Sequence, residues 1–425
     1  MSVRSAAVIG LGRVGLPLAL VLADRGLMVR GVDIDADAVA KLERGEMPFW
    51  EDGGQELLTR HVGGAFKPAV TAAGVRDCDY LILTLGTPVD NNMNPDLSQI
   101  DRALNSIRGE LRPGQTIVLR STVSPGTTQW VLAKIEDEFG LRVGTDIFLA
   151  FCPERIAEGR ALQELTTIPQ IVGGVDAGST ERAIELFSVL GAECLPTDDV
   201  SAELAKLFTN LYRYISFAIA NEFMIIAGQH RRDINHIVNL VNHGYKRGGL
   251  ALPGFSAGPC LFKDGFFLVN QIPFTDLIST AWKINESVPI FLVAALAQAM
   301  QLRNKKAVIL GAAFKANSDD SRQSLSYKVR KALLRERALV TMHDPHIRGY
   351  DADLGATLSD ADVVFVATNH DAYKDLSLEE LRGFVGKDCV VSDIWNIFGT
   401  DHTLFHLDEA IAAGGKPRQR AAVTF

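Results

Sequence analysis

Short apolar runs rich in β-branched residues alternate with longer helical patterns along the first third of the chain. The runs cover residues 6–9, 29–32, 80–84, 116–119 and 147–150. Strands that are covered by helices on both faces read as continuous apolar runs of this kind. The pattern therefore predicts a parallel sheet whose strands are connected by crossover helices.

Strand signals disappear from about residue 201 to 300, where helix-compatible residues dominate. They return in the last part of the chain, at residues 307–310, 339–343, 362–367 and 390–392. Segment 362–367 resembles segment 79–84, since an aspartate opens an apolar run in both. We therefore predict an α/β protein with two Rossmann-like parallel-sheet domains, residues 1–200 and 301–425, joined by a helical segment, residues 201–300. The basic, glycine-bearing tail, residues 414–420, is interpreted as a mobile terminus.

Composition and charge narrow the classes of function. The 425 residues are 47% hydrophobic and 22% charged, which is typical of a folded globular chain. A formal net charge of −8 argues against a nucleic-acid partner. The apolar runs are too short to cross a bilayer and the N-terminus lacks a signal-peptide layout, so we expect a cytoplasmic protein with no membrane partner. Neither a disulfide framework nor a metal site is expected, because the cysteines show no pairing motif. They are Cys78, Cys152, Cys194, Cys260 and Cys389.

A glycine-rich turn, Gly10-Leu11-Gly12-Arg13-Val14-Gly15, follows the first predicted strand and opens a helical pattern. Glycines permit a tight turn and bring a pyrophosphate close to a helix N-terminus, whose free N–H groups favour negative charge. Asp33 ends the second predicted strand, where it would bind ribose hydroxyls and repel a 2′-phosphate. The arrangement predicts an NAD site, with FAD as the alternative cofactor and a turn without a ligand as the alternative interpretation.

Further candidates follow other predicted strands, at the sheet edge where open α/β sheets bind ligands. Thr87 and Thr122 lie in hydroxyl-rich loops that would form walls of the cofactor site, although such loops are also common turn devices. Glu154 is either an acid on the same rim or a solvated surface group. Lys206 and Asn210 stand four residues apart on a predicted helix, and they point either into a cleft or along an exposed polar stripe.

Cys260 ends a loop that contains glycine and alanine, and Lys263 and Asp264 follow it closely. A nearby cation lowers the pKa of a thiol and increases its thiolate fraction, which suits a nucleophile. A buried structural cysteine is the competing interpretation. Lys315 and Arg322 flank an acidic turn after the first strand of the last part, and they predict either a phosphate-binding loop or a salt-bridged surface loop.

In this order, the segments resemble the nucleotide-sugar 6-dehydrogenases, a family that includes the UDP-glucose, GDP-mannose and UDP-N-acetylhexosamine dehydrogenases. The resemblance covers nearly the whole chain, and the segments that carry it are residues 10–19, 121–128, 153–155, 203–210, 221–222, 260–264 and 314–324. It implies an NAD-dependent, four-electron oxidation of the C6 hydroxyl of a nucleotide sugar to a carboxylate. It also implies a thiohemiacetal and then a thioester on Cys260, which water hydrolyses.

The resemblance implies roles for individual residues as well. Lys206 and Asp264 would handle protons and the developing oxyanion, and Asn210 would help to hold the reacting oxygen. Thr122 and Glu154 would position water. The residues implied in substrate binding are Glu154, Lys206, Asn210, Arg247, Gly258 and Lys315. Those implied in cofactor binding are Gly10, Gly12, Arg13, Val14, Gly15, Asp33, Thr87, Thr122, Lys263 and Arg322.

Two further details belong to this implied site. Lys315 would pair with the diphosphate of the substrate, and Arg247 would reach the sugar in the neighbouring subunit. The central helices would form a homodimer or a higher oligomer, as they do in the family.

Two positions depart from the pattern of the family. Ala257-Gly258 stands where the family has a Gly-Gly pair, and Pro259, directly before Cys260, removes a backbone N–H. Asp393-Ile394-Trp395-Asn396 stands where members carry an Asp-x-Arg pattern whose arginine contacts the nucleotide. The sugar stays open, because residues 153–155 resemble the N-acetylhexosamine branch, which we favour, whereas Lys263-Asp264 resembles the UDP-glucose and GDP-mannose branches.

Other functions are kept beside this one. UDP-glucose, or an unusual nucleotide sugar, is the alternative substrate within the family. A two-electron hydroxyacid dehydrogenase would need no cysteine and would stay active after a Cys260→Ser substitution. A non-catalytic NAD- or nucleotide-binding regulator would bind its ligands without producing NADH, although the joint presence of Lys206, Asn210, Cys260 and Asp264 argues against it.

Overall fold

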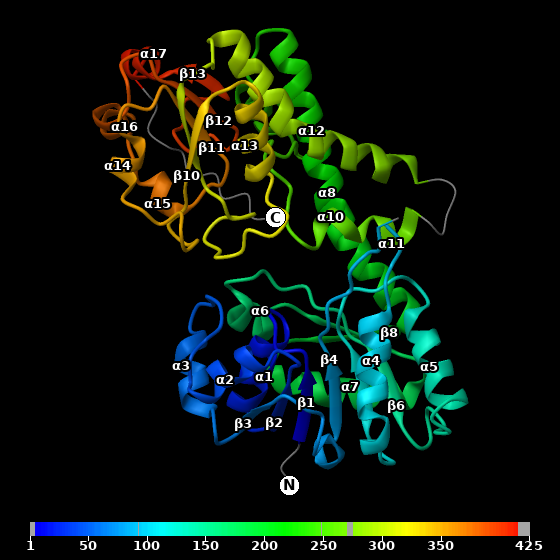
Figure 1. The fold of residues 1–425 in the computed structure, drawn as a ribbon. Helices are drawn as coiled ribbons and strands as arrows, with labels where there is room; N and C mark the ends of the chain where they lie inside the picture. The colour runs from blue at the N-terminus through cyan, green and yellow to red at the C-terminus, as the bar shows by residue number, and fades with distance from the viewer. Residues whose placement is uncertain (1–4, 92, 248, 270–274, 415–425) are drawn as a thin grey trace. The chain divides into compact units, whose positions relative to one another are not determined.

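The computed structural model describes residues 5–91, 93–247, 249–269 and 275–414, so the predicted mobile tail from residue 415 onward lies outside the described residues. The chain divides into two compact units. The first comprises residues 1–209 and 266–273, and the second comprises residues 210–265 and 274–425. Each unit contains a sheet with helices packed against it (Figure 1).

The sheet of the first unit has eight strands. They are β1 (Ser5–Ile9), β2 (Met28–Val32), β3 (Phe66–Ala69), β4 (Tyr80–Leu83), β5 (Thr116–Leu119), β6 (Phe148–Phe151), β7 (Gln170–Gly174) and β8 (Cys194–Asp198). Their order is β3-β2-β1-β4-β5-β6-β7-β8, and every pair is parallel except β6 and β7. The order reverses between β1 and β4, where open sheets of this kind bind ligands.

Helices cover both faces of this sheet, and alternate residues of a strand enter separate cores. Ala6 and Val8 belong to the core that also contains α1, whereas Ala7 and Ile9 belong to the core beneath α4 and α5. The α-helices of the unit are α1 (Gly15–Asp24), α2 (Ala36–Glu43), α3 (Gly54–His61), α4 (Ser98–Ile107), α5 (Thr127–Asp137), α6 (Ala161–Thr167), α7 (Ala177–Phe187) and α11 (Phe266–Val269). Short 3₁₀ helices cover Val75–Asp77, Arg108–Glu110 and Ser188–Leu190.

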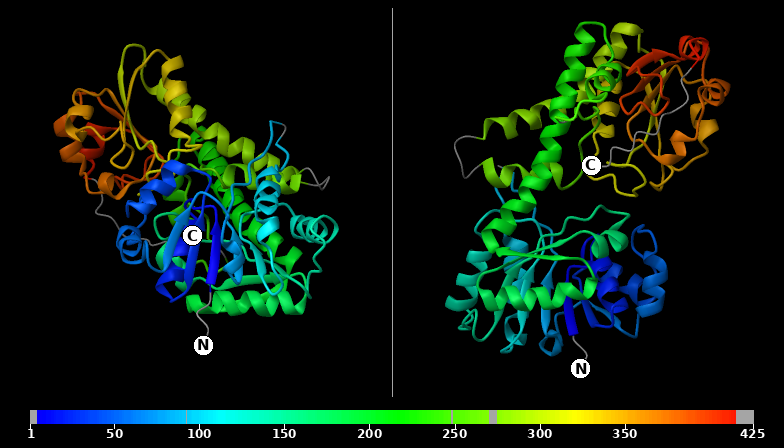
Figure 2. Two further views of the ribbon diagram at one scale, coloured as in Figure 1. Left: turned by 60° about the horizontal axis from the view of Figure 1, so that its bottom comes forward. Right: turned by 180° about the vertical axis from the view of Figure 1, so that it is seen from behind.

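A single long helix, α8 (Asp199–Gln229), begins in the first unit and continues in the second (Figure 2). The other helices of the second unit are α9 (Ile234–Asn242), α10 (Leu261–Asp264), α12 (Asp276–Ala299), α13 (Ser326–Arg335), α14 (Leu354–Leu358), α15 (Asp371–Lys374), α16 (Leu378–Phe384) and α17 (Leu407–Ala412). Its strands are β9 (Lys306–Leu310), β10 (Leu339–His343), β11 (Val363–Val366), β12 (Val390–Asp393) and β13 (Leu404–His406). They lie in the order β10-β9-β11-β12-β13, with β13 antiparallel to β12.

The predicted α/β class, with two sheets and helices between them in sequence, is confirmed, and each predicted strand is present with its ends shifted by one residue at most. The prediction missed β3, β7, β8 and β13, and it did not anticipate the two antiparallel pairs. Three of these strands lie at sheet edges, where Pro68 and Pro196 are tolerated and hydrophobic runs are not required. The fourth, β7, ends in two glycines, which weaken its strand signal.

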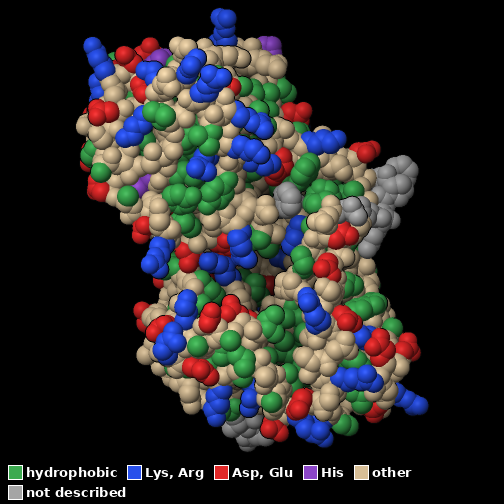
Figure 3. All heavy atoms as spheres, in the orientation of Figure 1, with side chains coloured by type: hydrophobic (Ala, Val, Ile, Leu, Met, Phe, Trp, Pro, Cys, Tyr) green, Lys and Arg blue, Asp and Glu red, His purple; other side chains and the backbone are tan. Residues whose placement is uncertain are grey.

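Among the described helices, none is both long and apolar enough to cross a membrane. On the face shown in Figure 3, acidic and basic side chains are interspersed over the first unit, whereas basic ones gather over a part of the second. The described residues contain no group of His, Cys, Asp and Glu arranged to hold a metal ion.

Candidate active site

The turn between β1 and α1 needs its glycines for steric reasons. Gly10 has a φ of 99°, and a Cβ there would lie 2.6 Å from the carbonyl oxygen of Thr84. A Cβ on Gly15 would lie 1.9 Å from the carbonyl oxygen of Gly10. Beside Gly12, by contrast, no atom lies within 4 Å of such a Cβ. The turn therefore leaves open space beside its middle glycine, where a phosphate can approach the backbone.

The surroundings of this turn suit a dinucleotide. The first turn of α1 contains no acidic residue and has no side-chain cap, so its N–H groups and dipole favour an anion. Asp33, which is half-buried, accepts hydrogen bonds from the backbone N–H groups of Leu11 (2.6 Å) and Asp35 (2.9 Å). These bonds fix the carboxylate at the end of β2, beside the glycine turn. The residues present therefore fit NAD.

Other predicted cofactor residues of the first unit lie near this turn or on loops that follow strands. The Arg13 guanidinium lies 5.0 Å from the centre of the Phe49 ring and 3.9 Å from a carboxylate oxygen of Glu158. Val14 is the N-cap residue of α1. Thr87, which is buried, follows β4, and Thr122, which is half-buried, follows β5.

Glu203, near the start of α8, binds the segment that follows β5 and contains Thr122, which we call the Thr122 loop (residues 120–128). The Glu203 carboxylate is fully buried and accepts from the backbone N–H groups of Gly126 (2.6 Å) and Thr128 (2.8 Å) and from the Thr128 hydroxyl (2.6 Å). Burial raises the pKa of Glu203, although these hydrogen bonds oppose the shift. Because Lys206 lies three residues further along α8, Glu203 fixes the start of the helix that carries it.

Sequence reasoning missed Arg120, which holds Glu154. The two side chains are buried, and Arg120 Nε lies 2.8 Å from Glu154 Oε2, with a second bond from the other guanidinium nitrogen. Glu154 Oε1 accepts from the backbone N–H groups of Arg155 (2.7 Å) and Ile156 (3.0 Å). The carboxylate thus accepts four hydrogen bonds, about its full capacity. A charged residue directly after the apolar run 116–119 was the available signal for Arg120.

The second unit brings Asn210 and Lys263 together at Asp264, four residues after Cys260. Cys260 is exposed and precedes α10, and the backbone N–H of Asp264 donates to its carbonyl oxygen (3.0 Å). The Asp264 side chain is 1% exposed. Asn210 Nδ2 donates to its Oδ2 (2.6 Å), and Lys263 Nζ donates to its Oδ1 (3.2 Å). Lys206 and Asn210 both lie on the continuous helix α8, four residues apart as predicted, and both are half-buried.

The other four cysteines differ from Cys260 in their surroundings. Burial raises the pKa of Cys78 to about 11 and the pKa values of Cys152 and Cys389 to about 12. It raises the pKa of the half-buried Cys194 as well. These thiols are therefore protonated near neutral pH, which fits their predicted structural role.

In the loop after β9, Arg322 forms an ion pair with Asp320: its Nε lies 3.0 Å from Oδ1 and 2.9 Å from Oδ2. The salt bridge expected in one interpretation of this loop is present. Lys315, on the same loop, is half-buried. Gly258 packs against Phe314 of this loop, since a Cβ on Gly258 would lie 2.5 Å from the Phe314 ring. Arg247 is exposed, with its guanidinium 5.0 Å from the centre of the Tyr245 ring.

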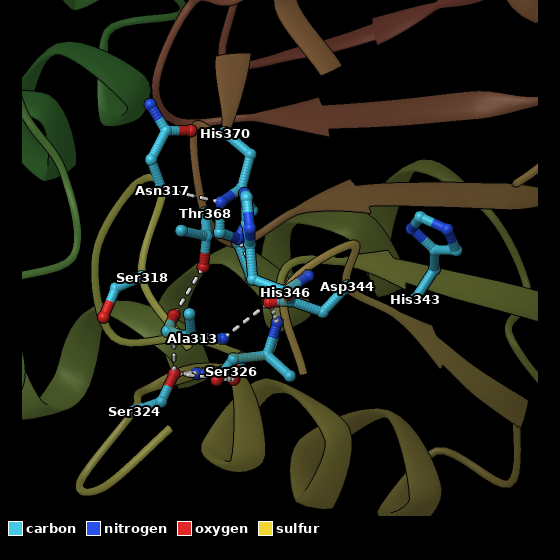
Figure 4. Close-up of polar contacts among 12 residues, drawn as sticks. Ala313, Asn317, Ser318, Ser324, Ser326, His343, Asp344, His346, Thr368 and His370 are labelled. Atoms are coloured by element: carbon cyan, nitrogen blue, oxygen red, sulfur yellow. Dashed lines mark hydrogen bonds and ion pairs between the residues drawn. The ribbon is translucent and has the colours of Figure 1, made fainter. Parts of the chain in front are cut away.

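Beneath this loop lies a buried group that sequence reasoning also missed (Figure 4). Asp344 accepts from the backbone N–H groups of Ala312 (2.7 Å) and Ala313 (2.8 Å) and from His370 Nε2 (3.1 Å). His370 Nδ1 accepts from the backbone N–H of Asn317 (2.9 Å), so the ring proton lies on Nε2. The group fixes both ends of the 312–317 segment. An acid directly after the strand at 339–343 was its sequence signal.

Two Rossmann-like sheets, a dinucleotide turn and an exposed cysteine beside a held carboxylate define an oxidoreductase that binds NAD. Comparison with known proteins agrees. The NAD binding, central and UDP binding domains of the UDP-glucose/GDP-mannose dehydrogenase family match residues 4–190, 200–287 and 308–400. The chain belongs to this family.

Relatives match over nearly the full length. A UDP-N-acetyl-D-mannosamine dehydrogenase of Pyrococcus horikoshii is 31% identical over 384 residues, which cover 88% of this chain and 91% of the relative. An NDP-N-acetyl-D-galactosaminuronic acid dehydrogenase of Ralstonia nicotianae is 32% identical, over 90% of this chain and 94% of the relative. The solved structure of UDP-D-ManNAc dehydrogenase from Pyrococcus horikoshii superposes with a TM-score of 0.85 at 29% identity, over 90% of this chain and 93% of that one. These comparisons confirm the class of enzyme.

Proposed function

We propose that this chain oxidises the C6 hydroxyl of a UDP-N-acetylhexosamine to a carboxylate, with Cys260 as the covalent nucleophile. The observation that carries the proposal is the exposed Cys260 thiol, which immediately precedes a helix whose buried Asp264 is held by Asn210 and Lys263. A carboxylate held in this way keeps a fixed position beside a reacting group. Two-electron alcohol oxidation needs no such cysteine, whereas oxidation to an acid uses it to hold the aldehyde.

The first unit would hold the cofactor. Gly10, Gly12 and Gly15, with Arg13 and Val14, would surround the pyrophosphate. Asp33 would bind the ribose, and the candidates on other loops are Thr87, Thr122, Lys263 and Arg322. The chemistry that bound NAD would supply is acceptance of a hydride from C6 of the sugar, with one NAD+ used in each of the two oxidation steps and therefore two per sugar.

Cys260 would hold C6 of the sugar covalently between the two oxidation steps. Its thiolate attacks the aldehyde carbon that the first oxidation leaves, and a C–S bond forms as the carbonyl π bond becomes an alkoxide, which takes up a proton. The resulting thiohemiacetal loses a hydride and its hydroxyl proton to become a thioester. Water adds to the thioester carbonyl, the C–S bond breaks, and the acid leaves while the thiol is regenerated. The four electrons leave as two hydrides.

The polar residues of the proposed site would have distinct roles in this scheme. Lys206 would stabilise the alkoxide by its positive charge, and Asn210 would donate a hydrogen bond to the reacting oxygen. Asp264 would move protons at that oxygen. Thr122 and Glu154 would position the hydrolytic water, which for Glu154 requires one of its four present hydrogen bonds to exchange.

The second unit would bind the nucleotide. Lys315 would pair with the diphosphate, Gly258 would contact the sugar through its backbone, and Arg247 would reach the sugar bound in a partner subunit. The matched UDP binding domain supports this placement of the nucleotide. We accordingly propose three functional domains: residues 1–200 for NAD, 201–300 for dimerisation and the cysteine loop, and 301–425 for the nucleotide.

A homodimer is supported by an apolar stripe on α8. Large hydrophobic residues are exposed along this helix at spacings of three, four and seven residues, which place them on one helix face: Phe208, Tyr212, Ile219, Phe223 and Ile226. An exposed apolar face of this kind is typical of an interface between copies of a chain. The occupant we propose is the same face of a second copy, and sedimentation velocity would report the dimer.

The sugar is chosen from the relatives. An N-acetylated sugar is named for both the Pyrococcus and the Ralstonia relatives, which supports a UDP-N-acetylhexosamine here. UDP-glucose is the second candidate, because the sequence Lys263-Asp264 after Cys260 resembles that of the UDP-glucose and GDP-mannose branches.

The test offers UDP-N-acetylmannosamine, UDP-N-acetylglucosamine, UDP-glucose and GDP-mannose separately and measures the initial rate of NADH formation. We expect kcat/KM to be highest for one of the two N-acetylated sugars. A highest value for UDP-glucose would support the second candidate. Measurable NAD binding without NADH from any sugar would contradict both and favour a non-catalytic binding protein.

A further inference from the structure

Asn221, a buried side chain of α8, binds the loop that leads to Cys260. It contacts Gly254, six residues before the cysteine. Asn221 is fully buried, and it donates through Nδ2 to the Gly254 carbonyl (3.0 Å) while its Oδ1 accepts from the Gly254 N–H (3.0 Å). One amide thus satisfies both polar groups of one backbone residue.

A second contact orients Asn221 itself. Asn221 Nδ2 also donates to Asn285 Oδ1 on α12 (2.9 Å), and Asn285 Nδ2 donates to the carbonyl oxygen of Tyr214 (3.0 Å). Both asparagines are completely buried. The network therefore ties the loop to two long helices of the same unit, through bonds that no water competes for.

On its other side Gly254 lies against Trp395, which follows β12. A Cβ built on Gly254 would lie 2.5 Å from Cζ3 and 2.7 Å from Cη2 of the indole. The indole N–H donates to the carbonyl oxygen of Ala367 (3.0 Å), so the ring cannot turn away without losing that bond. Asn221 and Trp395 together confine the backbone at Gly254.

The loop beyond Gly254 also packs on the second sheet. The Phe255 ring stacks on Phe365 of β11, with centroids 6.3 Å apart, and Gly258 lies against the Phe314 ring. These contacts are apolar and non-directional, so they do not by themselves fix the orientation of the backbone. Asn242 holds Leu250 further back in the loop by a similar pair of bonds, and the Gly258 N–H donates to the Gln323 carbonyl at 3.4 Å. Between these two points, the hydrogen bonds at Gly254 fix the direction of the segment that leads to Cys260.

We propose that Asn221 and Trp395 are positioning residues of the oxidation, which deliver the Cys260 thiol by fixing Gly254. The inference rests on the proposed function, since it assigns these residues to the step in which Cys260 attacks the aldehyde. In this chain Trp395 thus supports the nucleophile's loop from the position where related sequences carry an arginine. A displacement of about 1 Å at a nucleophile lowers the rate by about a hundredfold.

The first experiment compares Asn221→Ala with wild type in the full chain. We expect kcat to fall by about a hundredfold while the Kd for NAD, most of whose proposed contacts lie in the first unit, changes by less than about twofold. Hydrogen exchange of a peptide covering residues 250–261 should become at least about tenfold faster, since the Gly254 N–H loses its partner.

The matched control is Asn235→Ala. Asn235 is also a buried asparagine of the second unit, but its amide donates to Asp233 in the adjoining turn. Its loss should leave the exchange of residues 250–261 and kcat within about twofold of wild type. An equal fall in kcat for both variants, after matching for thermal stability, would overturn the inference.

A second experiment uses the contact between Gly254 and Trp395. Gly254→Ala should reduce kcat by at least about tenfold, because the new methyl group meets the indole. Added to Trp395→Leu, which removes the crowded ring atoms, the same substitution should cost nothing further, so the two effects are not multiplicative. Effects that multiply would overturn the assigned contact.

Failure of this inference is distinguishable from failure of the proposed function. Wild-type enzyme that oxidises no nucleotide sugar contradicts the proposed function and this inference with it. Wild-type activity that Asn221→Ala retains, whether or not residues 250–261 exchange faster, contradicts only the inference.

Discussion

Asp33 and Asp344 occupy equivalent positions in the two sheets. Each follows the strand next to the one that leads into a glycine turn. Asp33 accepts from one backbone N–H of its turn, that of Leu11, and Asp344 accepts from two, those of Ala312 and Ala313. The turns begin at Gly10 and Gly311, both with a φ of 99°. The two units therefore repeat one arrangement of two adjacent strands, a glycine turn and an acid that holds the turn.

Their environments differ, and with them their chemistry. Asp33 is half-buried, so part of its carboxylate remains accessible to a ribose. Asp344 is completely buried and is also bound by His370. In the second sheet the acid is thus used within the protein to hold the loop that carries Lys315.

Replacement of Asp33 by serine should change cofactor selectivity. The carboxylate repels a 2′-phosphate and accepts from ribose hydroxyls, and a hydrogen bond to a charged group contributes about 1.5–3 kcal/mol. We expect kcat/KM for NAD to fall by about 10- to 100-fold and the preference over NADP to shrink by more. Asp35→Ser, two residues away, is the control, because serine can still cap α2. An unchanged NAD preference would show that Asp33 does not contact the ribose.

Asp344→Asn should reduce stability in a pH-dependent way. Burial raises the pKa of Asp344, but the hydrogen bonds from His370 and the backbone outweigh it and lower the pKa from 3.8 to about 2. A depressed pKa means that the ionised group stabilises the fold above about pH 4 and that this stability is lost as the pH falls toward 2. The difference corresponds to about 2 kcal/mol at pH 7.

Urea unfolding of wild type and Asp344→Asn at pH 7, 4 and 3 checks this. The gap between the two proteins should be largest at pH 7 and should narrow at pH 3. A gap that is constant across this range would mean that the charge of Asp344 contributes nothing and that only its shape matters.

Glu203→Ala should destabilise the first unit. It leaves three donors near the start of α5 without a partner, at a cost of about 3 kcal/mol or more. Differential scanning calorimetry should show a lower Tm, and kcat should fall because the Thr122 loop loses its attachment to α8. Glu43→Ala, at an exposed position of α2, is the control and should change stability by less than about 0.5 kcal/mol.

Glu154→Gln should separate the oxidation steps from hydrolysis. If Glu154 positions water, the substitution slows release of the acid by about a hundredfold and a thioester accumulates on Cys260. Mass spectrometry of acid-quenched protein would detect the added uronyl group. If no uronyl group is detected and the acid is released at the wild-type rate, Glu154 has only a structural role through its bond with Arg120.

The sequence predicted the strands that contain apolar runs, most of which are buried on both faces. It missed the interior strand β7, whose run ends in two glycines, and it predicted the edge strand β10. It could not predict β3, β8 and β13, because an edge strand has one unpaired side and tolerates proline and polar residues. The glycine turn and Asp33 were predictable because local geometry demands those residue types. Arg120, Glu203 and Asn221 act through partners that are at least 33 positions away along the chain, and no local pattern reports such pairs.

In the proposed mechanism, Cys260 holds the sugar covalently while a second oxidation takes place. The most direct test is the amount of NADH formed per nucleotide sugar consumed, for wild type and for Cys260→Ser. We expect about two NADH per sugar for wild type and no net acid from the variant. About one NADH per sugar, with Cys260→Ser equally active, would contradict the thioester mechanism and indicate a two-electron alcohol dehydrogenase.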